Sequence, residues 1–214
     1  MQHTLLLLRH GLTSNKQPWR YTGQRQVFLQ NTGRSQAAEW IPLLQELPLE
    51  TVWTSPLHRC LETAVMLGSL MKKPVFSDSA LQEISLGTWE GLTRKQVQLL
   101  YPGEYEKRGN NFADYRPFQG ESFADLCRRV LPFVQVRLAR PGLSLAVTHA
   151  GVIRVICCQA SGRPLQNLFD FHPGFGSLTI LSSKQNKPAL EAVGLLPDDP
   201  DTSRILNNIR SDFA

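Results

Sequence analysis

Short runs of hydrophobic residues alternate with longer amphipathic segments along this chain. Two of the short runs are residues 4–9 (TLLLLR) and 144–148 (SLAVT), and a histidine and a glycine stand at or just after the end of each. Runs of this length predict buried β-strands that stop at the glycine. Residues 51–54, 74–76 and 177–182 predict three further strands.

Four amphipathic segments predict helices. One opens at Ser55 and Pro56, where a serine cap followed by a proline in the first turn predicts a helix that continues to Met71. The other three are residues 33–47, 122–139 and 152–160. Pro132 lies inside the second of these, and we expect it to bend that helix.

Alternating strands and helices predict an α/β fold, a three-layer sandwich in which helices flank a mostly parallel central sheet. With 214 residues, 42% of them hydrophobic, the chain can bury one sizeable core, and its length favours a single domain. Residues 92–121 are rich in aromatic residues and proline, and we expect an inserted lid over the C-terminal ends of the strands. We expect residues 197–214 to form a surface tail.

The balance of charge favours an anionic small molecule as the partner. The formal net charge is +5, which suits a phosphate ester but is also typical of a solvated surface. Lysine and arginine form no clustered run, so we expect no nucleic-acid partner. No apolar segment is long enough to span a membrane or to form a signal-peptide core, and we expect a cytoplasmic protein with no membrane partner.

The four cysteines do not suggest a catalytic or disulfide role. They form no CxxC pair, and two of them are adjacent within an apolar run, as expected for reduced thiols that pack as small hydrophobic groups.

Candidate chemistry gathers at the ends of three predicted strands. Arg9 and His10 end the first strand, Arg59 lies about one helical turn beyond the second, and His149 follows the strand at 144–148. Ligands of open α/β sheets bind at the carboxyl ends of the strands, so we expect these four side chains to meet.

Two histidines and two arginines suit phosphoryl transfer without a metal ion. Forked guanidinium groups bind phosphate oxygens and neutralise their charge. One neutral imidazole can attack phosphorus and carry the phosphoryl group, while the other donates to the transferring oxygens. Glu83 follows the third strand in an apolar stretch, which would favour its protonated form and make it the candidate acid for the leaving alcohol.

Each of these residues also has an ordinary structural interpretation. A single histidine at a strand end is usually structural, Arg59 could be a surface charge, and Glu83 could cap a turn. If each residue were merely structural, several features would have to coincide by chance: two strand-end histidines, a glycine at each break and arginines in matching positions. The pattern therefore favours the catalytic interpretation.

These segments together resemble the histidine phosphatase superfamily, also called the phosphoglycerate-mutase-like family. The segments that carry the resemblance are LLRHG at 7–11, YTG at 21–23, NTGRSQA at 31–37, TSPLHRCLETA at 54–64, Glu83 with GTWEG at 87–91, GES at 120–122 and THAG at 148–151. The resemblance implies one histidine-phosphatase-like domain over residues 1–214.

The resemblance also implies a role for each core residue. His10 would be phosphorylated, and Glu83 would protonate the leaving group and then activate water. Arg9, Arg59 and His149 would form the phosphate pocket.

Three further residues would contact the substrate phosphate by the same resemblance, namely Asn15, Thr22 and Gly23. Asn15 lies one residue nearer to His10 than the family asparagine usually does, and the family often has an acidic residue where Leu12 stands.

Within this family the sequence favours a phosphatase over a mutase. Cofactor-dependent mutases carry the segment Arg-Arg-Ser-Tyr-Asp-x-Pro-Pro-Pro, which residues 112–119 (FADYRPFQ) lack. Residues 83–91 are more similar to the phosphatase branch. Mutase-type transfer remains the alternative, and a non-catalytic phospho-ligand-binding protein is disfavoured because all five core residues are present.

The resemblance therefore implies a metal-independent phosphomonoesterase that acts on a small phosphorylated metabolite and needs no cofactor. An α-ribazole 5′-phosphate phosphatase, a broad-specificity phosphomonoesterase and a sugar-phosphate phosphatase all remain open, as does a homodimer. Six residues are candidates for contacts with the organic part of the substrate, although packing and surface charge explain them equally well: Trp19, Arg20, Arg25, Tyr115, Arg116 and Phe118.

Overall fold

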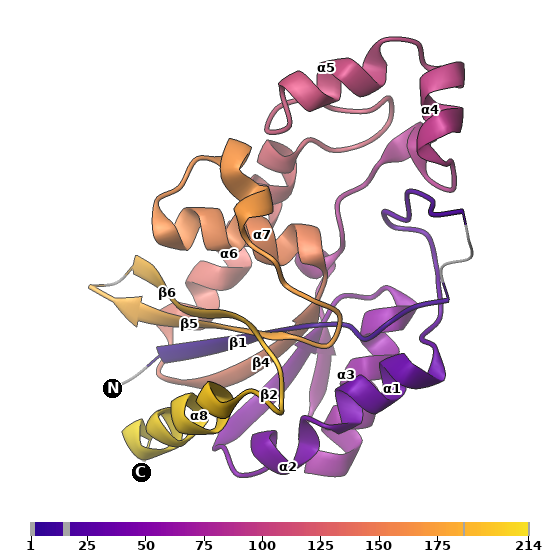
Figure 1. Cartoon of the computed structure of the whole chain (residues 1–214). Helices are drawn as coiled ribbons and strands as arrows, with labels where there is room; N and C mark the ends of the chain where they lie inside the picture. Colours follow the sequence, from indigo (N-terminus) through magenta and orange to yellow (C-terminus); the bar gives the residue numbers. More distant parts are fainter. Residues whose placement is uncertain (1–2, 15–17, 186, 214) are drawn as a thin grey trace.

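The computed structural model describes residues 3–14, 18–185 and 187–213, and its centre is a six-stranded sheet in the order β3-β2-β4-β1-β5-β6 (Figure 1). The strands are β1 (His3–Arg9), β2 (Leu49–Thr54), β3 (Val75–Ser77), β4 (Gly142–Thr148), β5 (Leu178–Lys184) and β6 (Lys187–Leu195). The predicted α/β class is confirmed. The sequence pattern did not predict β6.

The sheet is mixed rather than uniformly parallel. Strands β3, β2, β4 and β1 run parallel to their neighbours, whereas β5 is antiparallel to β1 and β6 is antiparallel to β5. The central strand β1 has five consecutive buried residues, as expected for a strand covered on both faces. Its Arg9 pairs with Thr148 of β4, so the two strands end side by side.

Helices form the two outer layers (Figure 1). The helices are α1 (Asn31–Ala38), α2 (Ile41–Leu44), α3 (His58–Met71), α4 (Arg94–Leu100), α5 (Glu104–Asn110), α6 (Phe123–Ala139), α7 (Ala150–Ser161) and α8 (Pro200–Asp212). Three short 3-10 helices are η1 (Ser79–Leu81), η2 (Gly87–Trp89) and η3 (Leu165–Asp170). Among the described residues, no helix combines the length and the apolar character needed to cross a membrane.

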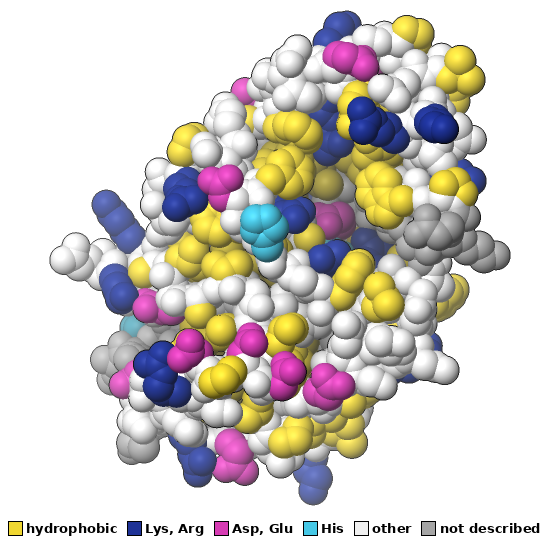
Figure 2. All heavy atoms as spheres, viewed as in Figure 1, with side chains coloured by type: hydrophobic (Ala, Val, Ile, Leu, Met, Phe, Trp, Pro, Cys, Tyr) yellow, Lys and Arg dark blue, Asp and Glu magenta, His cyan; other side chains and the backbone are white. Residues whose placement is uncertain are grey.

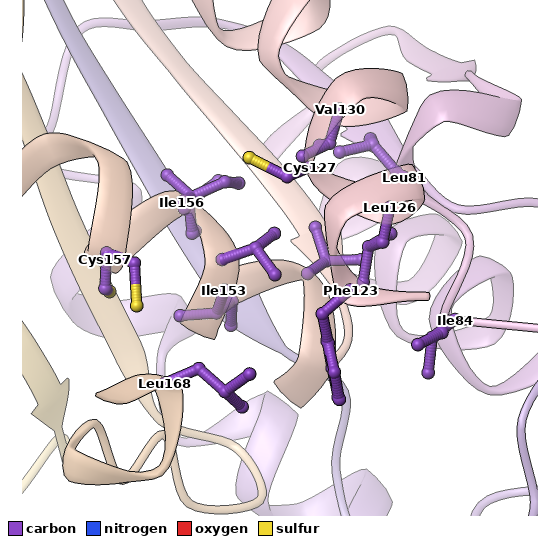
Figure 3. Packing of buried hydrophobic residues seen from close by; sticks show 14 of the residues in the cluster. Leu81, Ile84, Phe123, Leu126, Cys127, Val130, Ile153, Ile156, Cys157 and Leu168 are labelled. Carbon is purple, nitrogen blue, oxygen red and sulfur yellow. The ribbon is translucent and has the colours of Figure 1, made fainter. Parts of the chain in front are cut away.

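Side chains of β1 alternate between two hydrophobic cores. Leu5 and Leu7 belong to the core that α6 and α7 cover, and Leu6 and Leu8 belong to the core on the opposite face, with α2, α3 and α8. This alternation is the period-two geometry of a strand. Figure 3 shows the first core, where side chains of α6, α7 and η3 meet beside the segment that contains Ile84.

Two predicted helices differ from those observed. The segment at 33–47 divides into α1 and α2, because Pro42 lacks an N–H group and its ring disfavours a continuous helix. Helix α3 begins at His58 rather than at Ser55. Ser55 does not cap α3. Its Oγ instead lies 2.8 Å from Nε2 of His149, so the serine contacts the residues at the strand ends. Helix α6 runs through Pro132 as one helix.

The segment predicted to be a surface tail contains a helix that packs on the second core with one face. Residues 200–212 form α8, in which Thr202, Leu206 and Ile209 are buried against the second core. This segment has an amphipathic pattern, but most of its residues are polar, so the pattern was not recognised as a helix.

The predicted lid segment lies outside the three layers. It contains α4 and α5, which Figure 1 places at one end of the molecule, away from the sheet. That this segment is a lid over the C-terminal ends of the strands stays a prediction.

Candidate active site

His10 lies directly after β1, where backbone hydrogen bonds hold it against β4. Its N–H donates to the carbonyl oxygen of Thr148 at 3.1 Å. Its Nδ1 lies 2.8 Å from the carbonyl oxygen of Gly11, and because a carbonyl can only accept, Nδ1 carries the proton. In the neutral ring Nε2 therefore holds the lone pair. A Cβ on Gly11 would lie 2.1 Å from the carbonyl oxygen of Gly33, so a glycine is required here.

The surroundings of His10 keep its imidazole neutral. The side chain is buried, with 5% of its surface exposed. Burial, followed by the nearby charges of Arg59 and Arg9, holds the pKa of His10 well below its ordinary value. At neutral pH the ring is therefore neutral and lies beside two cations.

Arg9 presents a cation with one unsatisfied donor. Its Nη1 donates to the carbonyl oxygen of Pro173 at 2.8 Å, and its guanidinium lies 3.7 Å from the centre of the Phe175 ring. Its Nε is buried and has no hydrogen-bond partner among the described residues. Burial lowers the pKa of Arg9 to about 10, which leaves it charged at neutral pH. An anionic oxygen would satisfy this donor.

Arg59 is the second residue of α3 and holds the surrounding chain in place. Its Nη1 and Nη2 donate to the carbonyl oxygens of Arg25 and Gly23 at 2.9 and 2.8 Å, and its Nε donates to Nδ1 of His149 at 3.2 Å. Gly23 has a positive φ of 49°, and a Cβ there would lie 2.1 Å from a carboxylate oxygen of Glu90. Arg59 thus fixes the loop that closes one side of the site.

His149 lies at the N-terminus of α7 and is fully buried. Its Nδ1 accepts from Arg59, so Nε2 carries the proton in the neutral ring and donates to Oγ of Ser55 at 2.8 Å. The centres of the His149 and His10 rings are 5.2 Å apart. Burial, with smaller contributions from nearby cations, holds the pKa of His149 well below its ordinary value. Both of its nitrogens have protein partners, and a direct bond from His149 to a phosphoryl oxygen stays a prediction.

Glu83 reaches the site from the segment after η1. Its Oε1 accepts from the N–H of Ile84 at 3.0 Å and its Oε2 from the N–H of Gly151 at 3.2 Å. The carboxylate therefore has two backbone donors within a segment whose neighbours Leu81, Ile84 and Leu86 are buried, and its role as the acid stays a prediction. A Cβ on Gly151 would lie 2.3 Å from Oε1, so this glycine makes room for the acid.

Hydrogen bonds from Arg129 of α6 hold the segment that carries Glu83 in place. The guanidinium donates to four backbone carbonyl oxygens at 2.9–3.3 Å, those of Ser79, Ala80, Gln82 and Glu83. It is itself paired with Glu121 at 2.8 Å, and Glu121 accepts from the N–H of Ser85. Sequence reasoning missed Arg129, because nothing near it in the chain marks a role in the site.

These residues surround a cavity of about 220 Å³, here called the phosphate cavity. Its lining includes six of the eight predicted site residues: Arg9, His10, Thr22, Gly23, Arg59 and Glu83. Of the other two, His149 is fully buried and is not a lining residue, and Asn15 lies outside the described residues. Figure 2 shows the molecule hollowed on this face, with basic and hydrophobic side chains around the hollow.

Arg154 also lines this cavity and was not predicted. It lies on α7, and its Nε donates to the carbonyl oxygen of Phe171 at 3.0 Å. Burial lowers its pKa, and the charge of Glu83 opposes that shift. The signal that could have found it is its position in the helix that begins directly after His149.

Fold and site together define an α/β protein with a neutral histidine, arginines and a carboxylate around a small anion-sized cavity, the equipment of a phosphoryl-transfer enzyme. The chain belongs to the histidine phosphatase superfamily (branch 1), whose model matches residues 5–195. It is a phosphoric monoester hydrolase, in agreement with the prediction from the sequence.

Relatives and solved structures agree with this assignment. The chain is 33% identical over 172 residues to glucosyl-3-phosphoglycerate phosphatase of Mycolicibacterium vanbaalenii, and the match covers 76% of each chain. A mycobacterial glucosyl-3-phosphoglycerate phosphatase solved with inorganic phosphate is 30% identical, with a TM-score of 0.78 over 91% of this chain and 98% of that one. The α-ribazole phosphatase of Shigella flexneri is 26% identical, with a TM-score of 0.81 over 90% and 96% of the two chains.

Proposed function

We propose that this chain hydrolyses a small phosphorylated metabolite through a phosphohistidine at His10, without a metal ion. The observation that carries the proposal is the donor bond from Nδ1 of His10 to the carbonyl of Gly11, which leaves the Nε2 lone pair free in a cavity lined by Arg9 and Arg59. The arginines supply the positive charge that a metal ion would otherwise provide.

In the first half-reaction, Nε2 of His10 attacks phosphorus and the bond from phosphorus to the leaving oxygen breaks. The electron pair goes to that oxygen, and Glu83 gives it a proton. In the second half-reaction, the Glu83 carboxylate takes a proton from water, whose oxygen attacks phosphorus. The bond from phosphorus to Nε2 breaks, the lone pair returns to His10, and Glu83 is again protonated.

The natural substrate is a separate part of the proposal. α-Ribazole 5′-phosphate and glucosyl-3-phosphoglycerate are the first candidates, because proteins similar to this chain are named for them. A sugar-phosphate or broad specificity is tested in the same way, by a screen of phosphorylated metabolites scored by released phosphate.

The test of the mechanism is a rapid-quench experiment with 4-nitrophenyl phosphate. We expect an acid-labile, base-stable phosphohistidine on the peptide that contains His10, and full turnover in EDTA. The His10→Ala variant should show neither phosphohistidine nor turnover. Turnover that EDTA abolishes, or that His10→Ala retains, would contradict the mechanism.

Mutase activity is measured separately with 3-phosphoglycerate and a trace of 2,3-bisphosphoglycerate. We expect release of phosphate rather than isomerisation. Efficient isomerisation without phosphate release would contradict the proposed hydrolysis, because the phosphoryl acceptor would then be a second phosphorylated ligand rather than water.

A further inference from the structure

A second cavity of about 460 Å³ lies next to the phosphate cavity, and is here called the outer cavity. The two share part of their lining, namely Trp19, Tyr21, Glu83, Ile84, Leu86, Ala150 and Arg154. Because Glu83 is the proposed proton donor to the leaving oxygen, the organic part of the substrate extends from the phosphate cavity into the outer cavity. The side chains there therefore select the leaving group.

Arg108 of α5 lines the outer cavity among aromatic rings. Its guanidinium carbon lies 5.2–5.9 Å from the centres of four rings, those of Tyr21, Trp89, Phe112 and Phe123. Partial burial lowers its pKa, yet a guanidinium keeps its proton at neutral pH. The rings stabilise the cation and fix its position.

No carboxylate pairs with Arg108 among the residues that the structure describes. The ionisable groups around it are the phenols of Tyr21, Tyr105 and Tyr115, and a phenol supplies no negative charge at neutral pH. By contrast, Arg129 has a carboxylate partner at 2.8 Å. A cation partly removed from water without an anion is unfavourable, and a bound anion would compensate for it.

The charges on the wall of the outer cavity also favour an anion. Its charged lining consists of Arg94, Arg108 and Arg154 with one carboxylate, Glu83. Glu83 is already bound by two backbone N–H groups and affects the pKa of Arg154 rather than that of Arg108. The cavity thus has positive charge left for a group carried by the ligand.

We propose that Arg108 binds a second anionic group on the organic part of the substrate, a carboxylate or a second phosphate. This inference rests on the proposed function. It defines the substrate class as phosphomonoesters whose alcohol carries an oxyanion on a planar or apolar framework, which the aromatic walls contact. Phosphate monoesters without that second charge are the poorer substrates.

The test uses three benzyl phosphates that differ only in the group at the 4-position. The probes are 4-carboxybenzyl phosphate, 4-phosphonobenzyl phosphate and the neutral, similarly shaped 4-carbamoylbenzyl phosphate. For the unmodified protein we expect kcat/KM for at least one acid to exceed that for the amide about tenfold or more, the range of a charge-assisted hydrogen bond. The acid with the larger kcat/KM relative to the amide shows whether the site recognises a carboxylate or a phosphate.

Arg108→Met should bring this ratio close to one, and Arg108→Lys should retain part of it, because a lysine keeps the charge but loses the forked donors. A ratio of kcat/KM values within one variant is independent of the fraction of folded protein. Arg108→Gln replaces the methionine variant if that protein does not fold. The matched control is Lys107→Met, which removes an exposed cation from the same helix and should keep the ratio unchanged.

Two outcomes would overturn the inference: a ratio near one in the unmodified protein, or a ratio that Arg108→Met and Arg108→Gln preserve. Either can occur while all three esters are hydrolysed by way of His10, and the proposed function then stands. Failure to hydrolyse any of the three esters, with no phosphohistidine from 4-nitrophenyl phosphate, would instead overturn the proposed function.

Discussion

At the scale of single residues, hydrogen bonds from backbone groups decide which side-chain atoms can react. One carbonyl oxygen, that of Gly11, orients the His10 ring so that Nε2 is the free nitrogen. Two N–H groups, those of Ile84 and Gly151, hold the Glu83 carboxylate. Neither arrangement depends on flexible side chains, so both are in place before substrate arrives.

Glu83→Gln should lower kcat/KM on alkyl phosphates by about 10²–10⁴-fold, the range of general acid–base catalysis. The effect on 4-nitrophenyl phosphate should be much smaller in the formation of phosphohistidine, because that leaving group hardly needs a proton. Burst kinetics of nitrophenol release measure this step. Equal losses on the two substrates would show that Glu83 has another role.

Gly151→Ala should impair the same step without removing the carboxyl group. Its Cβ would lie 2.3 Å from Oε1 of Glu83 and displace the carboxylate. We expect a large loss on alkyl phosphates, a smaller one on 4-nitrophenyl phosphate, and no further loss when Glu83→Gln is added. Additive losses in the double variant would contradict this shared cause.

At the scale of elements, helix α6 supports the acid segment from behind through Arg129. Four carbonyl oxygens of residues 79–83 converge on this one guanidinium. A segment without helix or strand at Glu83 thereby gains a fixed backbone.

We expect Arg129→Met to lower kcat on alkyl phosphates at least about tenfold and to increase its dependence on the leaving group, because the acid loses its position. Arg129→Lys should recover little, since one ammonium cannot satisfy the same fork of acceptors. A steeper slope of log kcat against leaving-group pKa measures this effect. An unchanged slope would assign Arg129 a purely structural role.

Helix α8 contributes to stability rather than to chemistry. Leu206 is 3% exposed in the second core, so Leu206→Ala should lower the free energy of unfolding by about 2–5 kcal/mol. Asn207→Ala, at the exposed neighbouring position, is the matched control. Urea denaturation distinguishes the two. If both variants unfolded like the parent, the packing of α8 would contribute nothing.

At the scale of the whole molecule, the buried histidines of the site lower the free energy of unfolding at acid pH. His10 and His149 are buried, and burial together with Arg59 and Arg9 holds their pKa values well below 6.5. In the unfolded chain both titrate near their ordinary value, so below about pH 6.5 the unfolded state binds more protons than the folded state. The free energy of unfolding therefore decreases as pH falls through that range.

We expect each of these histidines to contribute a decrease of about 1.4 kcal/mol per pH unit below pH 6, until its folded-state pKa is reached. His10→Gln should reduce the pH slope of the free energy of unfolding between pH 6 and 5 by about one such contribution. Urea titrations at pH 7 and 8 serve as the control, because the pH slopes of the free energy of unfolding should there agree between His10→Gln and the unmodified protein. Parallel slopes below pH 6 would contradict the buried neutral state.

The sequence by itself determined the α/β class and indicated which residues gather around one cavity at the strand ends. Arg9, His10, Arg59 and Glu83 were predictable because each follows directly from a local signal: a buried strand, a glycine break or the first turn of a helix. Strand ends in such a sheet converge on one edge, so local signals sufficed to bring these residues together.

Only the tertiary structure decided the rest, since it depends on contacts between distant segments. Arg108 meets rings from positions 21, 89, 112 and 123, and Arg129 meets a segment about 50 residues before it. The partners of His149 and the packing of α8 are likewise long-range. Burial and charge at such residues come from packing, and no local pattern of the chain records which side chains will surround them.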